Sequence, residues 1–277
     1  MIPILMYHQV AELPRELDPL GLAVPPDRFL QQMSYLALHA YRCLSLLDVA
    51  CILREGRRAP AKSFVLTFDD GYHDVHSTAC PILERFGFTA TIFLVAGRMD
   101  ASSDWMGQEG SRSGVLLSWV EARDLARRGF VLGSHTLSHP RLTQLDDPSA
   151  FAEIRDSRLL LEDRLCAPVD VFSYPYSDSD PRIERLVESA GYTAACAGEV
   201  GPWSPFHLWR AQCVRDDTTL SFALKASGWY HRRIALRESP PGLFLRRCLR
   251  MLRRSRGNRK PSRVAVLSND PGRDPER

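Results

Sequence analysis

Short polar motifs that follow predicted strands contain the side chains from which a metal-dependent active site can be built. Asp69 and Asp70 close one predicted strand, and His135 and His139 follow another. Two histidines at positions i and i+4 of a helical turn project on one face, where they can share a cation. One carboxylate and two imidazoles leave an open position for water and suit zinc, with other divalent first-row metals possible. The pattern predicts a metal site with a second, free carboxylate beside it to act as a base.

A third motif is Phe172-Ser-Tyr-Pro-Tyr-Ser177, in which Pro175 stops a predicted strand. Its backbone turn can aim an N–H group into the same site. Each motif also has an ordinary interpretation, because Asp-Asp-Gly is a common turn, a histidine pair is often a solvated helix face and Tyr-Pro-Tyr is a common loop. Their coincidence at the ends of three strands favours the functional interpretation.

The elements that must position these motifs alternate between strand and helix. Strands are predicted at 2–6, 63–68, 88–95, 130–133, 169–174, 192–197 and 208–214, and helices at 25–39, 46–53, 75–86, 118–129, 147–165, 181–190 and 219–230. This alternation indicates a parallel sheet with crossover helices, either doubly wound or closed into a barrel. Both architectures place their active sites at the carboxyl ends of the strands, where the motifs lie.

The motifs T-F-D-D-G-Y, S-H-T-x-x-H-P and F-S-Y-P-Y resemble those of the polysaccharide deacetylases, the NodB-homology domain of carbohydrate esterase family four. The opening I-L-M-Y-H-x-V is similar to the branch of that family whose motifs are circularly permuted. The resemblance covers roughly residues 1–230 and implies an α/β fold, a distorted (β/α)7 barrel. We therefore expect one catalytic domain over residues 1–235, followed at 236–277 by a basic amphipathic helix and a disordered tail.

The resemblance also implies a role for each matching residue. Asp70, His135 and His139 hold a divalent metal, with zinc as the expected ion, and Asp69 is the general base. His8 is the general acid that protonates the leaving amine, and the backbone N–H of Tyr176 helps to stabilise the oxyanion. The implied reaction is metal-dependent hydrolysis of N-acetyl groups on the amino sugars of a poly- or oligosaccharide, with release of acetate.

The sequence departs from the family pattern at the third motif, where Phe172 occupies the approach on which many members carry an arginine that orients the base. Arg210 is the candidate substitute. The alternative for Arg210 is a surface ion pair, worth about 0–1 kcal/mol. His8 has the alternative of a satisfied core histidine. His73 and His76, just after the first motif, are interpreted as rim or surface residues rather than ligands.

Composition and charge exclude several other classes of protein. The 277 residues are 44% hydrophobic and 25% charged, which excludes a disordered chain, a collagen-like repeat and a disulfide-rich mini-protein. Residues 241–277 hold eleven of the 36 basic and three of the 33 acidic side chains, so this tail has a net charge of +8 and residues 1–240 have −5.

The basic tail predicts contact between the protein and a membrane surface. As a helix, residues 243–254 pair an apolar stripe with an arginine-rich face, which is typical of a helix at an anionic membrane surface. We expect peripheral membrane contact through residues 243–260, with a helix docked on the barrel as the alternative. No nucleic acid partner is expected, because no aromatic or motif pattern supports one.

Seven scattered cysteines and the lack of a signal-peptide or membrane-span pattern predict a cytoplasmic protein.

Two other functions stay open at this point. A deacylase of a lipid-linked or nucleotide-linked sugar, in cell-envelope or exopolysaccharide assembly, fits a cytoplasmic protein with a membrane-seeking tail. A carbohydrate-binding homologue without activity requires only the fold. Loops 10–25 and 98–117 are expected to shape the substrate groove.

Overall fold

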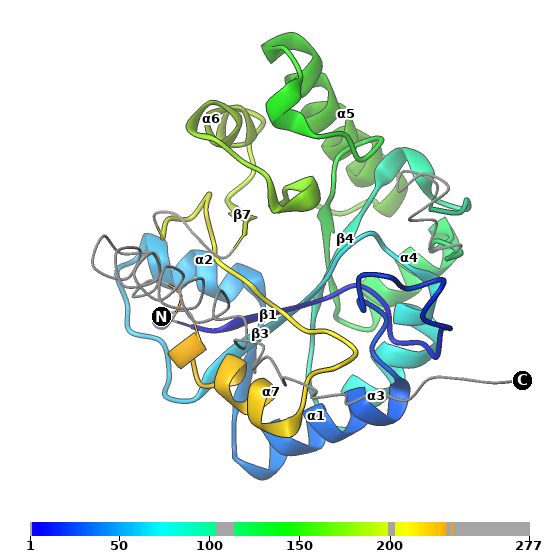
Figure 1. Ribbon diagram of the computed structural model, residues 1–277. Coiled ribbons are helices and arrows are strands. Elements are labelled where there is room, and N and C mark those ends of the chain that lie inside the picture. The colour runs from blue at the N-terminus through cyan, green and yellow to red at the C-terminus, as the bar shows by residue number, and fades with distance from the viewer. Residues whose placement is uncertain (1, 104–113, 199–202, 231–233, 235–277) are drawn as a thin grey trace, which may run out of the picture. The chain divides into compact units, whose positions relative to one another are not determined.

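The computed structural model describes residues 2–103, 114–198, 203–230 and 234 (Figure 1). The chain divides into a unit of Met1–Ile234 and a unit of Ala235–Arg277. All of the second unit lies outside the described residues, and with it the predicted basic helix and the membrane contact of residues 243–260. No helix of the described part has the length and apolar character needed to cross a membrane.

The fold is an α/β fold built on a curled parallel sheet, which confirms the predicted architecture. Its strands are β1 (Ile4–Tyr7), β2 (Arg42–Leu44), β3 (Ser63–Phe68), β4 (Thr91–Leu94), β5 (Val131–Ser134), β6 (Val171–Ser173), β7 (Ala194–Cys196) and β8 (Ala211–Gln212). They lie in the order β7-β6-β5-β4-β3-β1-β8, with β2 also paired to β3, and every pairing is parallel. The carboxyl ends of the strands therefore meet at one edge, as the alternation of elements predicts.

Most of the helices cover the outside of this sheet (Figure 1). The helices are α1 (Pro26–Leu38), α2 (Leu46–Arg54), α3 (Cys80–Glu84), α4 (Trp119–Arg127), α5 (Asp147–Leu165), α6 (Pro181–Ser189) and α7 (Thr219–Ala226). Of these, α2 packs against inward side chains. Short helical turns are η1 (Val75–Ala79), η2 (Ala96–Arg98), η3 (Leu142–Gln144) and η4 (Pro175–Ser177). The predicted helix 75–86 divides into η1, a π-helix, and α3. Strand β2 was not predicted, because three half-exposed residues carry little alternation.

Local signals explain where several helices begin. The side chain of Ser118 accepts from the backbone of Glu121, and the Glu121 carboxylate accepts from the backbone of Ser118, which completes the predicted capping box of α4. Ser45 and Asp48 form the same motif at α2, where it was not predicted. Asp180 caps α6 by accepting from two backbone N–H groups. Such caps satisfy N–H groups that the first turn of a helix leaves without partners.

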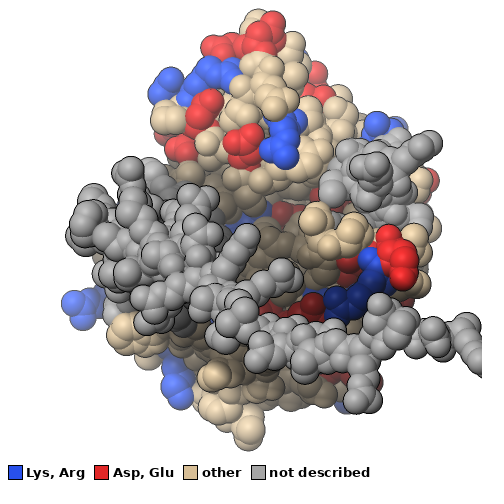
Figure 2. All heavy atoms as spheres, in the orientation of Figure 1, with Lys and Arg blue, Asp and Glu red and all other residues tan. Residues whose placement is uncertain are grey.

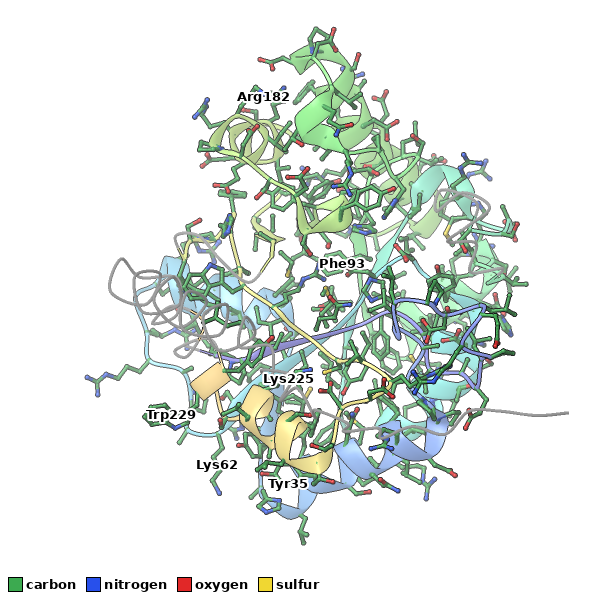
Figure 3. The ribbon with its side chains drawn as sticks, viewed as in Figure 1. Tyr35, Lys62, Phe93, Arg182, Lys225 and Trp229 are labelled. Carbon is green, nitrogen blue, oxygen red and sulfur yellow. The ribbon has the colours of Figure 1, made fainter. Side chains whose placement is uncertain are left out.

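Two hydrophobic clusters lie on opposite faces of the sheet. The larger packs the outward side chains of the strands against α1, α3, α5 and α6. The smaller joins inward side chains, including Ile4, Val65 and Phe93, to Leu46 and Val49 of α2. Figure 3 shows Phe93 near the middle of the molecule. The inner face is therefore apolar below the strand ends, and the polar side chains of the motifs lie above this layer.

The chain between β7 and β8 brings the two margins of the curled sheet together. The N–H of Leu208 donates to Ala195 O, and the N–H of Ala197 donates to Leu208 O, so this segment first pairs with β7. Three residues later Ala211 pairs with Leu5 of β1. Residues between these two contacts are held across the opening of the sheet, and Arg210 is one of them.

Candidate active site

Three predicted metal ligands, Asp70, His135 and His139, meet at the carboxyl edge of the sheet. Nε2 of His135 lies 3.5 Å and Nε2 of His139 lies 3.3 Å from Oδ1 of Asp70. One potential ligand atom from each residue lies within 4.8 Å of the others, and all three residues are buried. Buried charged and polar groups of this kind need a partner, and two imidazoles with a carboxylate are a donor set for a divalent metal.

The pleat of the strands explains why these side chains face inward. Val65 belongs to the inner cluster, and Thr67 and Asp69 follow it at intervals of two residues on the same face. On β5, Gly133 faces inward and His135 comes two residues later. A Cβ at Gly133 would lie 2.6 Å from the Phe93 ring, so glycine leaves room for that ring beneath the site.

Backbone turns with positive φ supply the remaining ligands. Asp70 has φ 72°, and Gly71, also at φ 72°, has no room for a Cβ because Leu94 Cδ2 would lie 2.8 Å away. Thr136 and His139 adopt φ values of 69° and 67°. The expectation that the two histidines share a helical turn is therefore wrong. A bend brings them together instead, and the N–H of His139 donates to Thr136 Oγ1 at 2.9 Å.

Outer contacts orient the histidine ligands. Nδ1 of His135 lies 2.7 Å from the carbonyl oxygen of Ser173, which leaves Nε2 directed at Asp70. Burial lowers the pKa of His135 to about 4, so its imidazole is neutral and able to bind a metal near pH 7. The Glu153 carboxylate of α5 accepts from the backbone of Leu137 and Ser138 and stabilises the bend. Sequence reasoning did not single out Ser173, although it lies within the third motif.

Asp69 lies beside the ligands and forms a buried, bidentate ion pair with Arg210. Nη1 of Arg210 lies 2.6 Å from Oδ1 of Asp69, and Nη2 lies 2.7 Å from Oδ2. Burial would raise the pKa of Asp69, but the charge of Arg210 and the hydrogen bonds from its guanidinium outweigh burial and lower the pKa. Asp69 is therefore ionised at neutral pH and able to accept a proton.

Arg210 is buried, with 1% of its surface exposed, so the alternative of a surface ion pair is wrong. Its Nη2 also donates to Ser173 Oγ at 2.9 Å, and its guanidinium carbon lies 5.8 Å from the centre of the Phe93 ring. A guanidinium can donate two parallel hydrogen bonds to one carboxylate and so fix the orientation of that carboxylate. Arg210 thus makes the contact with Asp69 that the substitution hypothesis requires.

A cavity of about 260 Å³ connects all the predicted site residues except the buried Arg210. Its lining includes Asp69, Asp70, His135, His139, His8, Tyr176, Arg141, Leu20 and Leu22. Because Tyr7 of β1 pairs with Phe68 of β3, His8 and Asp69 follow at neighbouring strand ends. Tyr176 lies in η4, directly after β6. Leu20 and Leu22 belong to the loop 10–25 that was expected to shape the groove.

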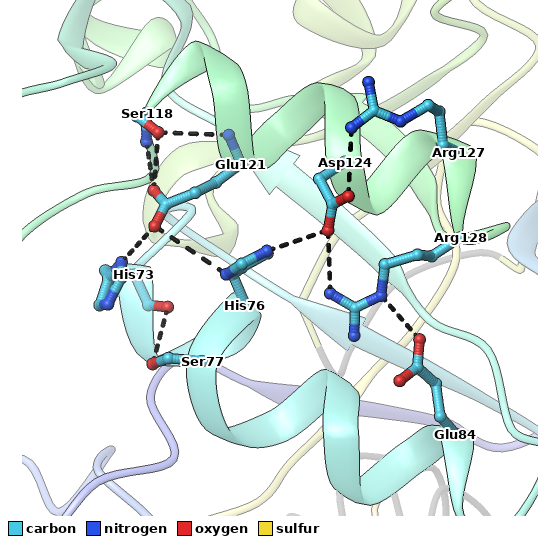
Figure 4. Close-up of polar contacts among 9 residues, drawn as sticks. All are labelled: His73, His76, Ser77, Glu84, Ser118, Glu121, Asp124, Arg127 and Arg128. Carbon is cyan, nitrogen blue, oxygen red and sulfur yellow. Dashed lines mark hydrogen bonds and ion pairs between the residues drawn. The ribbon is translucent and has the colours of Figure 1, made fainter.

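His73, just before η1, and His76 in η1 belong to a polar network with α4 (Figure 4). Nδ1 of His73 lies 2.7 Å from Glu121, and Nε2 of His76 lies 3.1 Å from Asp124. Glu121 is also the third helical residue of α4, whose side chain completes the capping box with Ser118. The interpretation of both histidines as rim or surface residues agrees with these contacts, and Arg128 extends the network to Glu84.

Metal binding is expected to depend on the pair His135 and His139 and not on the pair His73 and His76. Replacing His73 and His76 together with alanine removes ring nitrogens only from the network with α4, so metal content after dialysis is expected to match that of wild type. His139→Ala removes one of three ligands, and its metal affinity is expected to fall at least about 10-fold. Elemental analysis of both proteins checks the result. Loss of the metal from the His73/His76 variant would contradict the assignment of ligands.

Comparisons with known proteins agree with the fold and the site. A family model described as polysaccharide deacetylase matches residues 56–195. The putative polysaccharide deacetylase YxkH of Bacillus subtilis is 26% identical over 200 residues, which cover 72% of this chain and 65% of that protein. The poly-beta-1,6-N-acetyl-D-glucosamine N-deacetylase of Escherichia coli is 29% identical over 134 residues, which cover 47% of this chain and 20% of that protein. The chain thus spans less than two thirds of these curated relatives.

Among solved structures, the deacetylase PplD of Streptococcus pyogenes, in complex with acetate, superposes with a TM-score of 0.71. It is 25% identical, and the match covers 81% of this chain and 97% of PplD. The family match includes the strands and turns that supply Asp69, Asp70, His135, His139 and Tyr176. With half of its length matched by the family model, the chain belongs to the polysaccharide deacetylase family.

Proposed function

We propose that this protein is a metal-dependent hydrolase that removes N-acetyl groups from the amino sugars of a poly- or oligosaccharide. One observation carries the proposal. A complete set of ligands, Asp70, His135 and His139, lines one cavity together with an ionised carboxylate, Asp69, that is oriented by a buried arginine. A binding protein without turnover has no need for this second carboxylate, whose burial costs free energy unless it is paired.

A divalent ion held by these residues supplies polarisation of the acetamide carbonyl and a lowered pKa for a bound water. Residues of the chain carry out the proton transfers and help to stabilise the oxyanion. Asp69 accepts the proton of the attacking water, because its lowered pKa keeps it ionised. His8 donates a proton to the departing amine of the sugar. The N–H of Tyr176 donates a hydrogen bond to the carbonyl oxygen as negative charge develops on it.

Two finer points belong to this proposal. We propose zinc as the ion, because two imidazoles and one carboxylate suit it. We also propose that the chain belongs to the branch with circularly permuted motifs, because His8 on the first strand, rather than a late histidine, is the candidate acid. Support comes from the pairing of β1 beside β3, through which His8 follows a strand end adjacent to that of Asp69.

Acetate release tests the proposed function. The zinc-loaded protein is incubated with oligomers of β-1,4- and β-1,6-linked N-acetylglucosamine, and acetate and free amines are both measured. We expect release from at least one of these substrates, loss of release after treatment with a chelator, and recovery on adding zinc back. The protein heated past unfolding controls for background hydrolysis. A metal-loaded, folded protein that releases no acetate from either series contradicts the proposal.

A further inference from the structure

Tyr176 has a backbone conformation that is unusual for an aromatic residue. Its φ and ψ are 59° and 14°, and Ser177 after it has φ 54°. A left-handed conformation is unfavourable for a non-glycine residue, so surrounding contacts must hold it. Because the direction of the Tyr176 N–H depends on this turn, whatever holds the turn also aims that group.

Two side chains of the bend after β5 hold the Tyr176 ring. The ring of His139 packs against it edge to face, with ring centres 4.8 Å apart. The guanidinium carbon of Arg141 lies 4.1 Å from the centre of the same ring, well within the range of a cation–π contact. A metal ligand and an arginine two residues later therefore both contact Tyr176.

Arg141 is also connected to the far side of the turn. Its Nη1 lies 3.6 Å from Oδ2 of Asp178, and this oxygen accepts from Thr143 Oγ1 at 2.7 Å. Arg141 thus spans the turn from Tyr176 to Asp178 while lining the same cavity as Asp69 and Asp70. Nearly half of its side chain is exposed, so its ion pair adds little, and the stacked contact is the one with a defined geometry.

We infer that Arg141 is a positioning residue, which stacks on Tyr176 and holds the left-handed turn that aims the Tyr176 N–H into the cavity. The inference rests on the proposed function, in which that N–H stabilises the developing oxyanion. An interaction of this kind strengthens in the transition state and has little effect on ground-state binding. Arg141 therefore affects kcat more than KM.

The kinetics of acetate release distinguish a positioning role of Arg141 from a role in substrate binding. Arg141→Met keeps much of the side chain's length but removes its charge and planar group, and we expect kcat to fall about 10-fold while KM stays within about twofold. Arg141→Lys keeps a cation and is expected to recover part of kcat. Asp178→Asn removes the negative charge that pairs with Arg141 but keeps one oxygen that can accept from Thr143 Oγ1, and its kcat is expected to stay within about twofold of wild type. A raised KM with unchanged kcat would overturn the inference, because Arg141 would then bind substrate itself.

A matched control is Arg127→Met on α4, because Arg127 is an exposed arginine whose side chain pairs with Asp124. This variant is expected to change neither constant. Tyr176→Gly then tests whether Arg141 acts through the ring, because glycine tolerates the positive φ and removes the stacked group. In the Tyr176→Gly background, Arg141→Met is expected to have no further effect on kcat. A second 10-fold loss there would overturn the inference.

Unfolding measurements keep the inference distinct from the proposed function. In urea denaturation, a double-mutant cycle of Arg141→Met and Tyr176→Leu is expected to show a coupling of about threefold to fivefold in the unfolding equilibrium constant. If this coupling is present and the wild-type protein releases no acetate, the proposed function fails although the stack is real. If the coupling is absent, the stack and the inference both fail, whatever the activity.

Discussion

Arg210→Met is expected to lower the free energy of unfolding by about 3–5 kcal/mol, because it leaves the Asp69 carboxylate buried without its partner. Both side chains are almost completely buried, and the two hydrogen bonds between them are short. A domain of this size is stable by about 5–15 kcal/mol, so the loss is a large part of the total. Urea denaturation of the metal-free protein measures it.

Arg182→Met is the matched control for this result. Arg182 lies on α6, in the upper part of Figure 3 and far from Phe93, and its Nη1 lies 2.7 Å from Asp147. Figure 2 shows acidic and basic side chains interspersed over α5 and α6, where such pairs are exposed to water. Asp147 is exposed and Arg182 is half-buried, and Arg182 Nη2 also donates long hydrogen bonds to the carbonyl oxygens of Leu142 and Thr143. Breaking these water-accessible contacts is expected to cost about 1 kcal/mol. An equal cost for Arg182→Met and Arg210→Met would contradict the argument from burial.

The cost of Arg210→Met is also expected to depend on pH. In the wild-type protein the pKa of Asp69 is lowered, so its ion pair contributes stability above the unfolded pKa near 4, and this contribution is lost as the pH falls. Without Arg210, burial raises the pKa of Asp69, and its protonated form needs no cation. The difference in stability between variant and wild type should therefore be smaller at pH 4 than at pH 7. A difference that grows toward pH 4 would contradict this sign.

Asp69→Asn is expected to lower kcat for acetate release by about 10²–10⁴-fold, because an amide cannot accept the proton of the attacking water. Asparagine has nearly the same shape and keeps one oxygen to accept a hydrogen bond from Arg210. Metal content is expected to stay at the wild-type value, because the ligands Asp70, His135 and His139 are unchanged. Steady-state kinetics and elemental analysis of the same preparation check both statements.

The stability of Asp69→Asn must be measured beside its activity, because the variant leaves Arg210 as the uncompensated charge. The double variant Asp69→Asn/Arg210→Met removes both charges and is expected to be more stable than the sum of the two single effects predicts. If Asp69→Asn is folded, retains metal and keeps wild-type kcat, Asp69 is not the base. If kcat falls only in proportion to lost metal, the effect belongs to the metal site instead.

Much of the site could be predicted from the sequence, because a strand followed by polar residues is a local pattern. The pleat aims every second residue of β3 and β5 to the same face, and parallel strands bring their carboxyl ends to one edge. The inward direction of Asp69 and His135 follows from these two rules, and Asp70 and His139 lie within four residues of them, in turns with positive φ. The bend that joins the two histidines did not follow, because the spacing i, i+4 fits a helical turn as well as it fits two residues with positive φ.

Only the tertiary structure decided which distant residues complete the site. Arg210 reaches Asp69 because the segment after β7 pairs first with β7 and then with β1, and 141 residues separate the two side chains in the chain. The contact of Arg141 with Tyr176 likewise joins two loops that follow different strands. The sequence by itself determined the ligands, the candidate base and the alternation of strand and helix. It left two alternatives for Arg210 and gave no partner for Arg141, because the free energy that brings these side chains to their partners comes from closing and burying the whole sheet.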